Sequence, residues 1–218
     1  MHPRMLKQAG LSIVRPQTRR DAMPACSSCG TQNPDGQRFC GECGSAMPRP
    51  GEVRRRLITV LFCDMVGSTE LGERLDAERL RKVLDRYFGA MRVVIQRHGG
   101  TVEKFIGDAV VGTFGIPEAH EDDALRAVRT ALEMQEAAAQ IDAEIDDPGV
   151  RMVVRIAIHC GEAFADEAAA TQGRIAGDVF NTAARLQAAA EPGDVVVSAA
   201  AEPMLRRHVN LRRWARSS

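Results

Sequence analysis

Strand-like apolar runs and helix-like apolar periodicities alternate along the chain from residue 57 onward. The runs over residues 57–62 and 152–159 have the length of strands and are rich in branched aliphatic residues, which predicts buried strands. Between them, apolar residues recur at helical spacing in two segments. One follows Asp76, a good N-cap residue, and stops at Gly99, and the other covers residues 121–145. This mixture of helices and strands predicts an α+β fold.

Shorter elements complete the pattern. Two strand-length runs flank the dipeptide Gly107-Asp108, which predicts a β-hairpin over residues 101–114. Residues 194–198 predict a further strand. The Ala-rich and poorly patterned residues 163–172 predict a loop.

Two acidic residues stand at the ends of these predicted strands. Asp64 follows the run over residues 57–62, and Asp108 occupies the tip of the hairpin. If the tip lies beside the end of the first strand, the two carboxylates repel each other unless cations separate them. Carboxylate oxygens suit Mg²⁺ or Mn²⁺, which lie about 3.5–4 Å apart in two-metal sites. For each acid on its own the alternative is an ordinary turn, because Asp and Gly are common turn residues.

A short segment of small residues follows Asp64. Gly67, Ser68 and Thr69 let backbone N–H groups approach a ligand, and a helical turn that begins near Glu70 would direct its positive end to the same place. Triphosphate binding is the natural use of such a segment. The alternative is a strand that ends in an Asp-capped turn.

Residues 177–186 predict an Ala-rich helix with two polar residues on one face. Asn181 and Arg185 are four residues apart and are therefore neighbours on the helix surface. A guanidinium offers a planar set of donors to phosphoryl oxygens on which negative charge develops. For this segment alone, a surface helix with a solvated arginine is an equally good interpretation.

Three segments together resemble the catalytic core of the class III nucleotidyl cyclases of the soluble bacterial type: residues 62–69 (FCDMVGST), 104–108 (KFIGD) and 177–186 (GDVFNTAARL). The resemblance implies an α+β fold of the ferredoxin-like or palm-type cyclase sandwich. It also implies conversion of ATP or GTP to the 3′,5′-cyclic monophosphate with release of pyrophosphate. A diguanylate cyclase has a similar sheet, but the sequence contains no Gly-Gly-Asp-Glu-Phe-like turn.

The resemblance assigns roles to individual residues. Asp64, Asp108 and the backbone of Met65 would hold two Mg²⁺ or Mn²⁺ ions in each active site. Asn181 and Arg185 would orient the ribose and stabilise the transition state. The backbone after the first metal ligand would bind the triphosphate of the substrate through Val66, Gly67, Ser68 and Thr69.

Lys104 implies that the base is adenine. In cyclases that use ATP, a lysine at this position donates a hydrogen bond to a ring nitrogen of adenine, whereas guanylate cyclases usually carry an acid. The usual partner of this lysine is an Asp or Thr three residues before Gly177, and here that residue is Arg174. Arg174 cannot accept a hydrogen bond from the adenine amino group, which weakens the assignment to ATP. Outside the resemblance, Lys104 is an ordinary solvated charge.

The resemblance also implies a head-to-tail homodimer with two equivalent sites. In this family the metal-binding aspartates come from one protomer, and the base-selecting lysine and the Asn/Arg pair come from the other. The implied function is therefore that of a homodimeric adenylate cyclase acting on ATP.

A regulatory role is the alternative function. Family members continue past the strand at residues 195–197 into a helix and a β-hairpin that brings a lysine to the triphosphate. No second strand pair is visible before Ser218, although Arg212 and Arg213 could partly replace the missing cation. The alternative is thus a cyclase-homology module that is inactive alone and binds nucleotide or a partner cyclase.

Two Cys-x2-Cys pairs precede the cyclase-like part, Cys26 with Cys29 and Cys40 with Cys43. Four thiolates at this spacing predict a zinc ribbon with a structural Zn²⁺. Two disulfides are the alternative, disfavoured because the sequence shows no secretory signal and the cytosol is reducing. Zinc ribbons also bind nucleic acid, but this one has few basic residues and the chain has a formal net charge of zero.

Length and composition fit one sizeable domain and one small module. The chain has 218 residues, of which 44% are hydrophobic, and no run is long and apolar enough to span a membrane. We therefore expect a cytoplasmic protein with no membrane partner. The expected organisation is a disordered basic extension over 1–23, the ribbon over 24–47, a linker over 48–56, the cyclase domain over 57–208 without its C-terminal hairpin, and a basic tail over 209–218.

Overall fold

The computed structural model describes residues 24–26, 28–34, 36–47, 53–145, 147, 149, 151–166 and 175–212. The chain divides into two compact units, Met1–Arg49 and Pro50–Ser218. The named helices and strands all lie in the second unit. In chain order they are β1 (Val53–Val66), α1 (Ser68–Arg74), α2 (Ala77–Arg97), β2 (Thr101–Ile106), β3 (Ala109–Phe114), α3 (Asp123–Glu144), β4 (Val153–Asp166), β5 (Ile175–Ala176), α4 (Val179–Ala189), β6 (Val195–Val197) and α5 (Glu202–Leu205).

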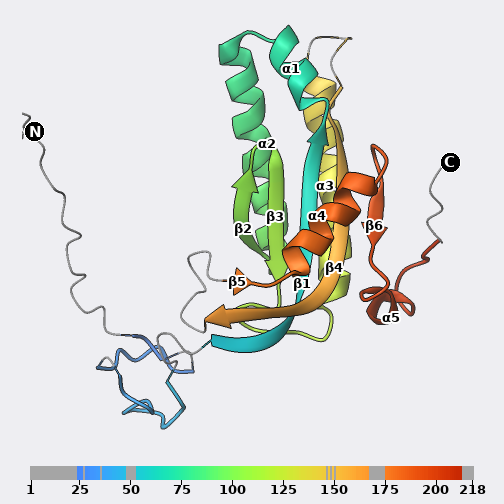
Figure 1. The fold of residues 1–218 in the computed structure, drawn as a ribbon. Coiled ribbons are helices and arrows are strands. Elements are labelled where there is room, and N and C mark those ends of the chain that lie inside the picture. The colour runs from blue at the N-terminus through green and yellow to red at the C-terminus, as the bar shows by residue number, and fades with distance from the viewer. Residues whose placement is uncertain are drawn as a thin grey trace, which may run out of the picture. The chain divides into compact units, whose positions relative to one another are not determined.

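The second unit is built on a six-stranded sheet with β1 in its interior (Figure 1). The strand order is β2-β3-β1-β4-β5, and β6 pairs with β4. β1 is antiparallel to both β3 and β4, whereas β6 is parallel to β4. The C-terminal end of β1 therefore lies beside the start of β3 and the start of β4.

Alternate residues of β1 face two different cores. Leu61, Cys63 and Met65 pack with residues of α2 and α3, whereas Val60 and Phe62 pack with residues of α4. In Figure 1, α2 and α3 accordingly cover one face of the sheet and α4 covers the other. Because both faces of β1 are covered, its apolar run is continuous, which is why the sequence predicts a buried strand.

The two long helices confirm the sequence predictions. Asp76 accepts hydrogen bonds from the backbone N–H groups of Glu78 and Arg79 at 3.0 and 2.9 Å, and so N-caps α2. This helix ends just before Gly99, which has a φ of 78°. α3 lies within the predicted span of 121–145.

The predicted hairpin and the later strands are also confirmed. β2 and β3 pair in antiparallel register up to Ile106 and Ala109, with Gly107 and Asp108 as the connecting turn. The predicted strands over 152–159 and 194–198 correspond to the first part of β4 and to β6.

β1 and β4 are longer than the sequence predicts, which corrects two boundaries. Residues 53–56 of the expected linker over 48–56 belong to β1, which begins at Val53 and pairs from there with the end of β4. β4 in turn continues into the expected loop over 163–172, where Ala163 and Ala165 are buried. Alanine has a low preference for strands, so its alternation with exposed residues is a weak signal. The remainder of that expected loop, from residue 167 onward, lies outside the described residues.

The C-terminal part that the structure describes ends at residue 212. After β6 it contains α5 and turns, and no strand follows β6 up to that residue. Leu205 is fully buried, and Val209 and Leu211 pack against the same core. Val209 and Leu211 are therefore packed against the domain, which does not fit the expected tail boundary at residue 209.

Several expected features fall outside the described residues, namely the extension over 1–23, Arg174 and residues 213–218 with Arg213. In the described part of the chain, no helix combines the length and the apolar character needed to cross a membrane.

Candidate functional site

Asp64 lies near the C-terminal end of β1, and two residues hold its carboxylate. Arg155, its register partner on β4, donates from Nε and Nη2 to Oδ2 at 3.1 and 2.9 Å. Gln187 of α4 donates from Nε2 to the same oxygen at 3.0 Å. The Asp64 side chain is 17% exposed, so the carboxylate remains accessible while the charge of Arg155 balances its own.

Asp108 occupies the turn between β2 and β3. Gly107 before it has a φ of 62°, a left-handed conformation that glycine adopts without strain. Cys63 of β1 pairs with Val110 of β3. Asp64 follows Cys63 and Asp108 lies two residues before Val110, so both acids lie on the same side of this antiparallel pair. Burial, followed by the charges of Asp64 and Asp108, raises the pKa of the Cys63 thiol to about 12. The structure thus brings the two acids into one neighbourhood.

This set of oxygen atoms fits hard divalent cations. Among the described residues, none donates a hydrogen bond to Oδ1 of Asp64, so this oxygen is available to a ligand. Mg²⁺ and Mn²⁺ prefer carboxylate and carbonyl oxygens, and the backbone of Met65 directly follows Asp64 in β1. A cation between Asp64 and Asp108 would also relieve the repulsion between their charges.

The segment after the first carboxylate turns from β1 into α1. Val66 closes the strand, Gly67 has a φ of 82°, and Ser68 is the first residue of the helix. A Cβ atom on Gly67 would lie 3.6 Å from the backbone oxygen of Arg151. The N–H groups at the start of a helix have no acceptor within the helix. The four residues predicted to bind a triphosphate, Val66 to Thr69, therefore lie directly beyond the carboxylate.

Helix α4 carries the predicted Asn/Arg pair on its exposed face. Asn181 donates to Oδ1 of Asp178 at 3.2 Å. Arg185 donates to Oγ1 of Thr182 at 3.2 Å and pairs with Asp178 at 3.6 Å, and its side chain is 73% exposed. Among the described residues, the hydrogen bonds and ion pairs of both side chains stay within α4 and its N-cap, and both residues are exposed, so their polar groups are accessible from outside the chain.

Lys104 on β2 lies beside the same helix. Its Nζ atom is 5.0 Å from the ring centroid of Phe180, the residue before Asn181, which is a cation–π contact. No contact among the described residues joins Lys104 or Arg185 to the acids. One chain therefore groups the predicted site residues into two sets, the acids at the end of β1 and the lysine with the polar face of α4.

Arg155 and Gln187 were missed by the sequence analysis, although each breaks a local pattern. Arg155 is a charged residue inside the otherwise apolar run over 152–159. Gln187 continues the spacing of Val179 and Ala183, which form the buried stripe of α4. A polar residue at a position that the period assigns to the core is a sign of a specific partner.

His159, near the middle of β4, has a structural environment. Its Nδ1 atom lies 2.9 Å from Oγ of Ser198, which follows β6. Burial lowers the pKa of His159, and the charge of Asp178 opposes this effect. The imidazole thus connects β4 with the chain after β6.

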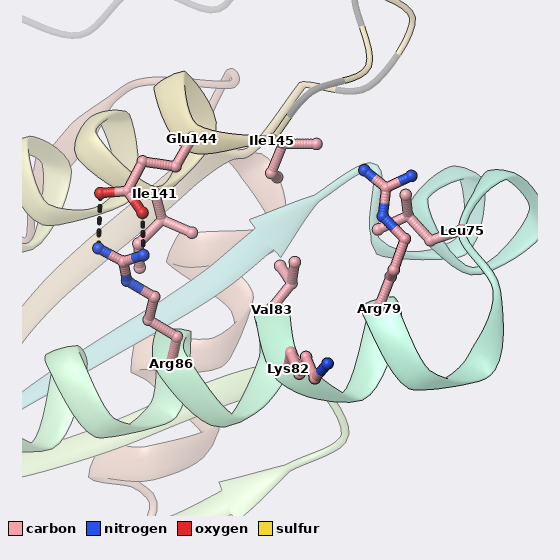
Figure 2. A pocket seen from close by; sticks show the side chains of 8 residues that line it. All are labelled: Leu75, Arg79, Lys82, Val83, Arg86, Ile141, Glu144 and Ile145. Atoms are coloured by element: carbon pink, nitrogen blue, oxygen red, sulfur yellow. Dashed lines mark hydrogen bonds and ion pairs between the residues drawn. The ribbon is translucent and has the colours of Figure 1, made fainter.

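A pocket of about 210 Å³ lies between α2 and the C-terminal end of α3 (Figure 2). Leu75, Val83 and Ile141 supply apolar surface, and an ion pair between Arg86 and Glu144 spans one side. None of its lining residues belongs to the two sets described above, so we do not assign this pocket to the candidate active site.

The first unit brings its four cysteines together. The Sγ atoms of Cys26, Cys29, Cys40 and Cys43 all lie within 4.8 Å of one another. Two of the separations are 3.6 Å, between Cys26 and Cys43, and 3.5 Å, between Cys29 and Cys40. A tetrahedral Zn²⁺ with each sulfur at about 2.3 Å would give separations of about 3.8 Å. The four thiols, which form no disulfide, therefore fit a structural zinc ion.

Asn33 supports this cluster and was also missed by the sequence analysis. Its side chain is buried, its Nδ2 atom donates to Sγ of Cys40 at 3.5 Å, and its Oδ1 atom accepts from the N–H of Gly41 at 2.9 Å. The backbone N–H groups of Cys43 and Glu42 lower the pKa of Cys40 to about 6. These donors favour the thiolate form that zinc requires.

Replacing two of the cysteines is expected to remove zinc without unfolding the second unit. The wild-type protein should contain one zinc per chain, and Cys40→Ser/Cys43→Ser none, because two thiolates cannot complete the site. Elemental analysis measures the metal, and thermal unfolding reports the second unit. Ser28→Ala keeps all four thiols and is the control. Zinc that stays in the double variant would assign these cysteines another role.

Residues 53–216 match the family described as "Adenylate and Guanylate cyclase catalytic domain", and residues 26–47 match the family described as "zinc-ribbon domain". The first match covers most of the chain. The chain therefore belongs to the adenylate and guanylate cyclase family, and a zinc-ribbon domain precedes its catalytic domain. Both the resemblance and the α+β fold class are thereby confirmed.

Two relatives from Rhizobium meliloti (strain 1021) show the extent of the similarity. Adenylate cyclase 2 is 37% identical over 130 residues, which are 58% of this chain and 35% of the relative. Putative adenylate cyclase 3 is 30% identical over 146 residues, which are 67% of this chain and 23% of the relative. The matched part is thus about a third or less of the length of either relative.

Two solved structures share the fold. The adenylyl cyclase CyaB from P. aeruginosa has a TM-score of 0.66 and 29% identity, over 72% of this chain and 84% of that chain. The guanylyl cyclase Cya2 has a TM-score of 0.63 and 33% identity, over 70% of this chain and 79% of that chain. Because the two are named for different nucleotides, the similarity does not choose between ATP and GTP.

Proposed function

We propose that this chain is an adenylate cyclase that converts ATP to 3′,5′-cyclic AMP and pyrophosphate as a head-to-tail homodimer. The observation that carries the proposal is the pair of acids, Asp64 and Asp108, at neighbouring strand ends. Arg155 and Gln187 hold the first acid and leave one of its oxygens available. Such an arrangement fits a site for two Mg²⁺ or Mn²⁺ ions.

In the proposed reaction the 3′-hydroxyl of the ribose loses its proton to water and its oxygen attacks the α-phosphorus, while the bond from that phosphorus to the leaving pyrophosphate breaks. Asp64, Asp108 and the backbone of Met65 would hold the metal ions. When bound, such ions lower the pKa of the 3′-hydroxyl and neutralise phosphate charge. Asn181 orients the ribose, and Arg185 donates to the phosphoryl oxygens as negative charge develops.

Other residues of the site bind the triphosphate. The segment from Val66 to Thr69 leads from β1 into α1, and N–H groups at the start of a helix have no acceptor within the helix and suit phosphate oxygens. Arg155, whose side chain is 31% exposed, adds a positive charge held in place by Asp64. We therefore add Arg155 to the residues proposed to face the substrate.

The separation of the two sets of residues supports the dimer. Asn181 and Arg185 lie on the exposed face of α4 and make no contact with Asp64 or Asp108 among the described residues. A second copy of the chain would place its own α4 face against the acids of the first. By symmetry the same contact forms twice, which gives two equivalent sites.

Turnover of ATP by the purified chain is the direct test of the proposal. With Mn²⁺ present, we expect cyclic AMP from ATP and much less cyclic GMP from GTP. Equal rates with both nucleotides would contradict the assignment of the base. The absence of either product would contradict the activity.

Lys104→Glu is expected to lower kcat/KM for ATP about 30-fold. The acid cannot donate to adenine, and loss of a charged hydrogen bond costs about 2 kcal/mol. Lys82→Glu, which makes the same charge change at an exposed residue of α2 paired with Glu78, is the control and should keep the wild-type value. If both variants lose activity equally, Lys104 does not recognise the base.

A regulatory cyclase-homology module is the second candidate, and one observation favours it. The described residues that follow β6 contain no strand pair that could bring a lysine to the triphosphate. This candidate predicts that the chain binds ATP and Mn²⁺ but forms no product alone, and that a partner cyclase gains activity when it is added. Product formation by the isolated chain would exclude it.

A further inference from the structure

Gln187 is a buried polar residue that reaches the proposed metal site. Its side chain is 5% exposed and lies on the face of α4 that carries Val179 and Ala183. A buried amide is unfavourable unless it forms hydrogen bonds. The bond that Gln187 forms runs from Nε2 to Oδ2 of Asp64 at 3.0 Å.

Gln187 and Arg155 approach the same carboxylate oxygen from different elements. Gln187 belongs to α4, above one face of the sheet, whereas Arg155 lies beside Asp64 in the neighbouring strand β4. Two donors that converge on Oδ2 from different directions restrict rotation of the carboxylate. The other oxygen, Oδ1, receives no hydrogen bond from the described residues and is left in a fixed position.

The two donors contribute different effects. The guanidinium of Arg155 provides both charge and direction, whereas the amide of Gln187 is neutral and provides direction. Removal of the amide therefore changes the orientation of Asp64 without changing the net charge around it.

We infer that Gln187 is a positioning residue, which orients Asp64 so that the free oxygen binds the metal ion. The inference rests on the proposed function, because it concerns the metal ligand named there. Hydrogen-bond partners of metal ligands commonly change metal affinity by about 10–100-fold when they are replaced.

The geometry of α4 distinguishes the positioning role of Gln187 from the role of Asn181 and Arg185, which lie on the exposed face of the helix. At about 100° per residue, Gln187 lies about 200° around the helix axis from Arg185. Gln187 thus faces the sheet of its own chain, whereas Asn181 and Arg185 face away from it. In the proposed dimer, Gln187 acts on the acid of its own chain while Arg185 serves the site of the partner.

The variant Gln187→Met tests the inference, because methionine has a similar volume and no donor. Binding of Mn²⁺ is measured by electron paramagnetic resonance in the presence of 3′-deoxy-ATP, which lacks the attacking hydroxyl, so the readout needs no turnover. We expect Mn²⁺ to bind about tenfold more weakly than to the wild type.

Thr130→Val is the matched control for the loss of a buried hydrogen bond. Thr130 is fully buried in α3, and its hydroxyl donates to the carbonyl oxygen of Arg126 at 2.8 Å. This variant should lower the thermal unfolding midpoint about as much as Gln187→Met and leave Mn²⁺ binding unchanged. Weakened binding in both variants would assign the effect to general loosening and overturn the inference.

The remaining outcomes separate this inference from the proposed function. If Gln187→Met binds Mn²⁺ as tightly as the wild type, Gln187 does not position the ligand, and the proposed function stands. If wild-type protein binds no more Mn²⁺ than the nucleotide alone, both the proposed function and the inference fail.

Mixed dimers test whether Gln187 acts on Asp64 of its own chain or through the exposed face of α4. When Gln187→Met pairs with Arg185→Ala, the complete site takes Asp64 from the Arg185→Ala chain, which keeps its own Gln187. The Mn²⁺ requirement of this site for activity should therefore match the wild type. When Gln187→Met pairs with Asp108→Ala, the complete site uses Asp64 beside the methionine, and the requirement should rise about tenfold. The reverse pattern would show that Gln187 acts through the exposed face of α4 and would overturn the inference.

Discussion

The Asp108→Ala variant is expected to lose about a thousandfold in cyclic AMP formation and to keep the thermal stability of the wild type. Asp108 is partly exposed in the β2–β3 turn and forms no hydrogen bond or ion pair with the described residues, so its removal leaves no partner unpaired. Loss of a metal ligand, in contrast, removes several kcal/mol of transition-state stabilisation. The rate at saturating Mn²⁺ and ATP and the unfolding midpoint measure the two effects.

Asp85→Ala is the matched control, because Asp85 is an exposed acid on α2 that pairs with Arg81 at 3.7 Å. It should leave both the rate and the unfolding midpoint unchanged, since exposed ion pairs contribute little. If Asp108→Ala turns over ATP at the wild-type rate, the two-metal site proposed here is wrong.

Asp64 is better tested by replacement with asparagine than with alanine. Asp64→Ala would remove the acceptor of Arg155 and of the buried Gln187, which would cost about 1–3 kcal/mol of stability. Asp64→Asn keeps an oxygen that can accept from these donors while it removes the charge. The asparagine variant therefore separates loss of the metal ligand from loss of stability, two effects that Asp64→Ala would combine.

Features with a strong local signal could be predicted from the sequence. Asp76 precedes a regular apolar stripe and caps α2 as expected, and Gly107-Asp108 forms the turn of the predicted hairpin. The approach of Asp108 to Asp64 could also be anticipated, because it required only that the hairpin lie beside the first strand. These features depend on capping, turn chemistry and periodicity, which neighbouring residues determine.

Features that depend on the arrangement of distant segments could not be predicted. Arg155 and Gln187 are 91 and 123 residues away from Asp64, and only the strand order and the position of α4 bring them to one oxygen. The extension of β1 to Val53 similarly depends on its partner, because the alanines of β4 give a weak strand signal. In each case a contact between segments far apart in the sequence determines the local structure.

A mixture of Asp108→Ala and Arg185→Ala, each inactive alone, is expected to recover about a quarter of the wild-type activity. In a head-to-tail dimer, one site of each mixed dimer receives both acids from the Arg185→Ala chain and the arginine from the Asp108→Ala chain. About half of the dimers are mixed at random exchange, and each has one complete site of two. The assay follows cyclic AMP after native mass spectrometry has shown that subunits exchange.

The control mixture combines Asp108→Ala with Asp64→Asn. Both changes affect the set of acids, so in every mixed dimer each site lacks one of the two carboxylates and no activity should return. Recovery in the first mixture and not in the second would show that Arg185 serves the active site whose acids come from the other chain of the dimer. The exposed position of Arg185 on α4 fits this arrangement. If the first mixture exchanges subunits and stays inactive, both sets serve one nucleotide within a single chain, and α4 must then move toward Asp64 when the substrate binds.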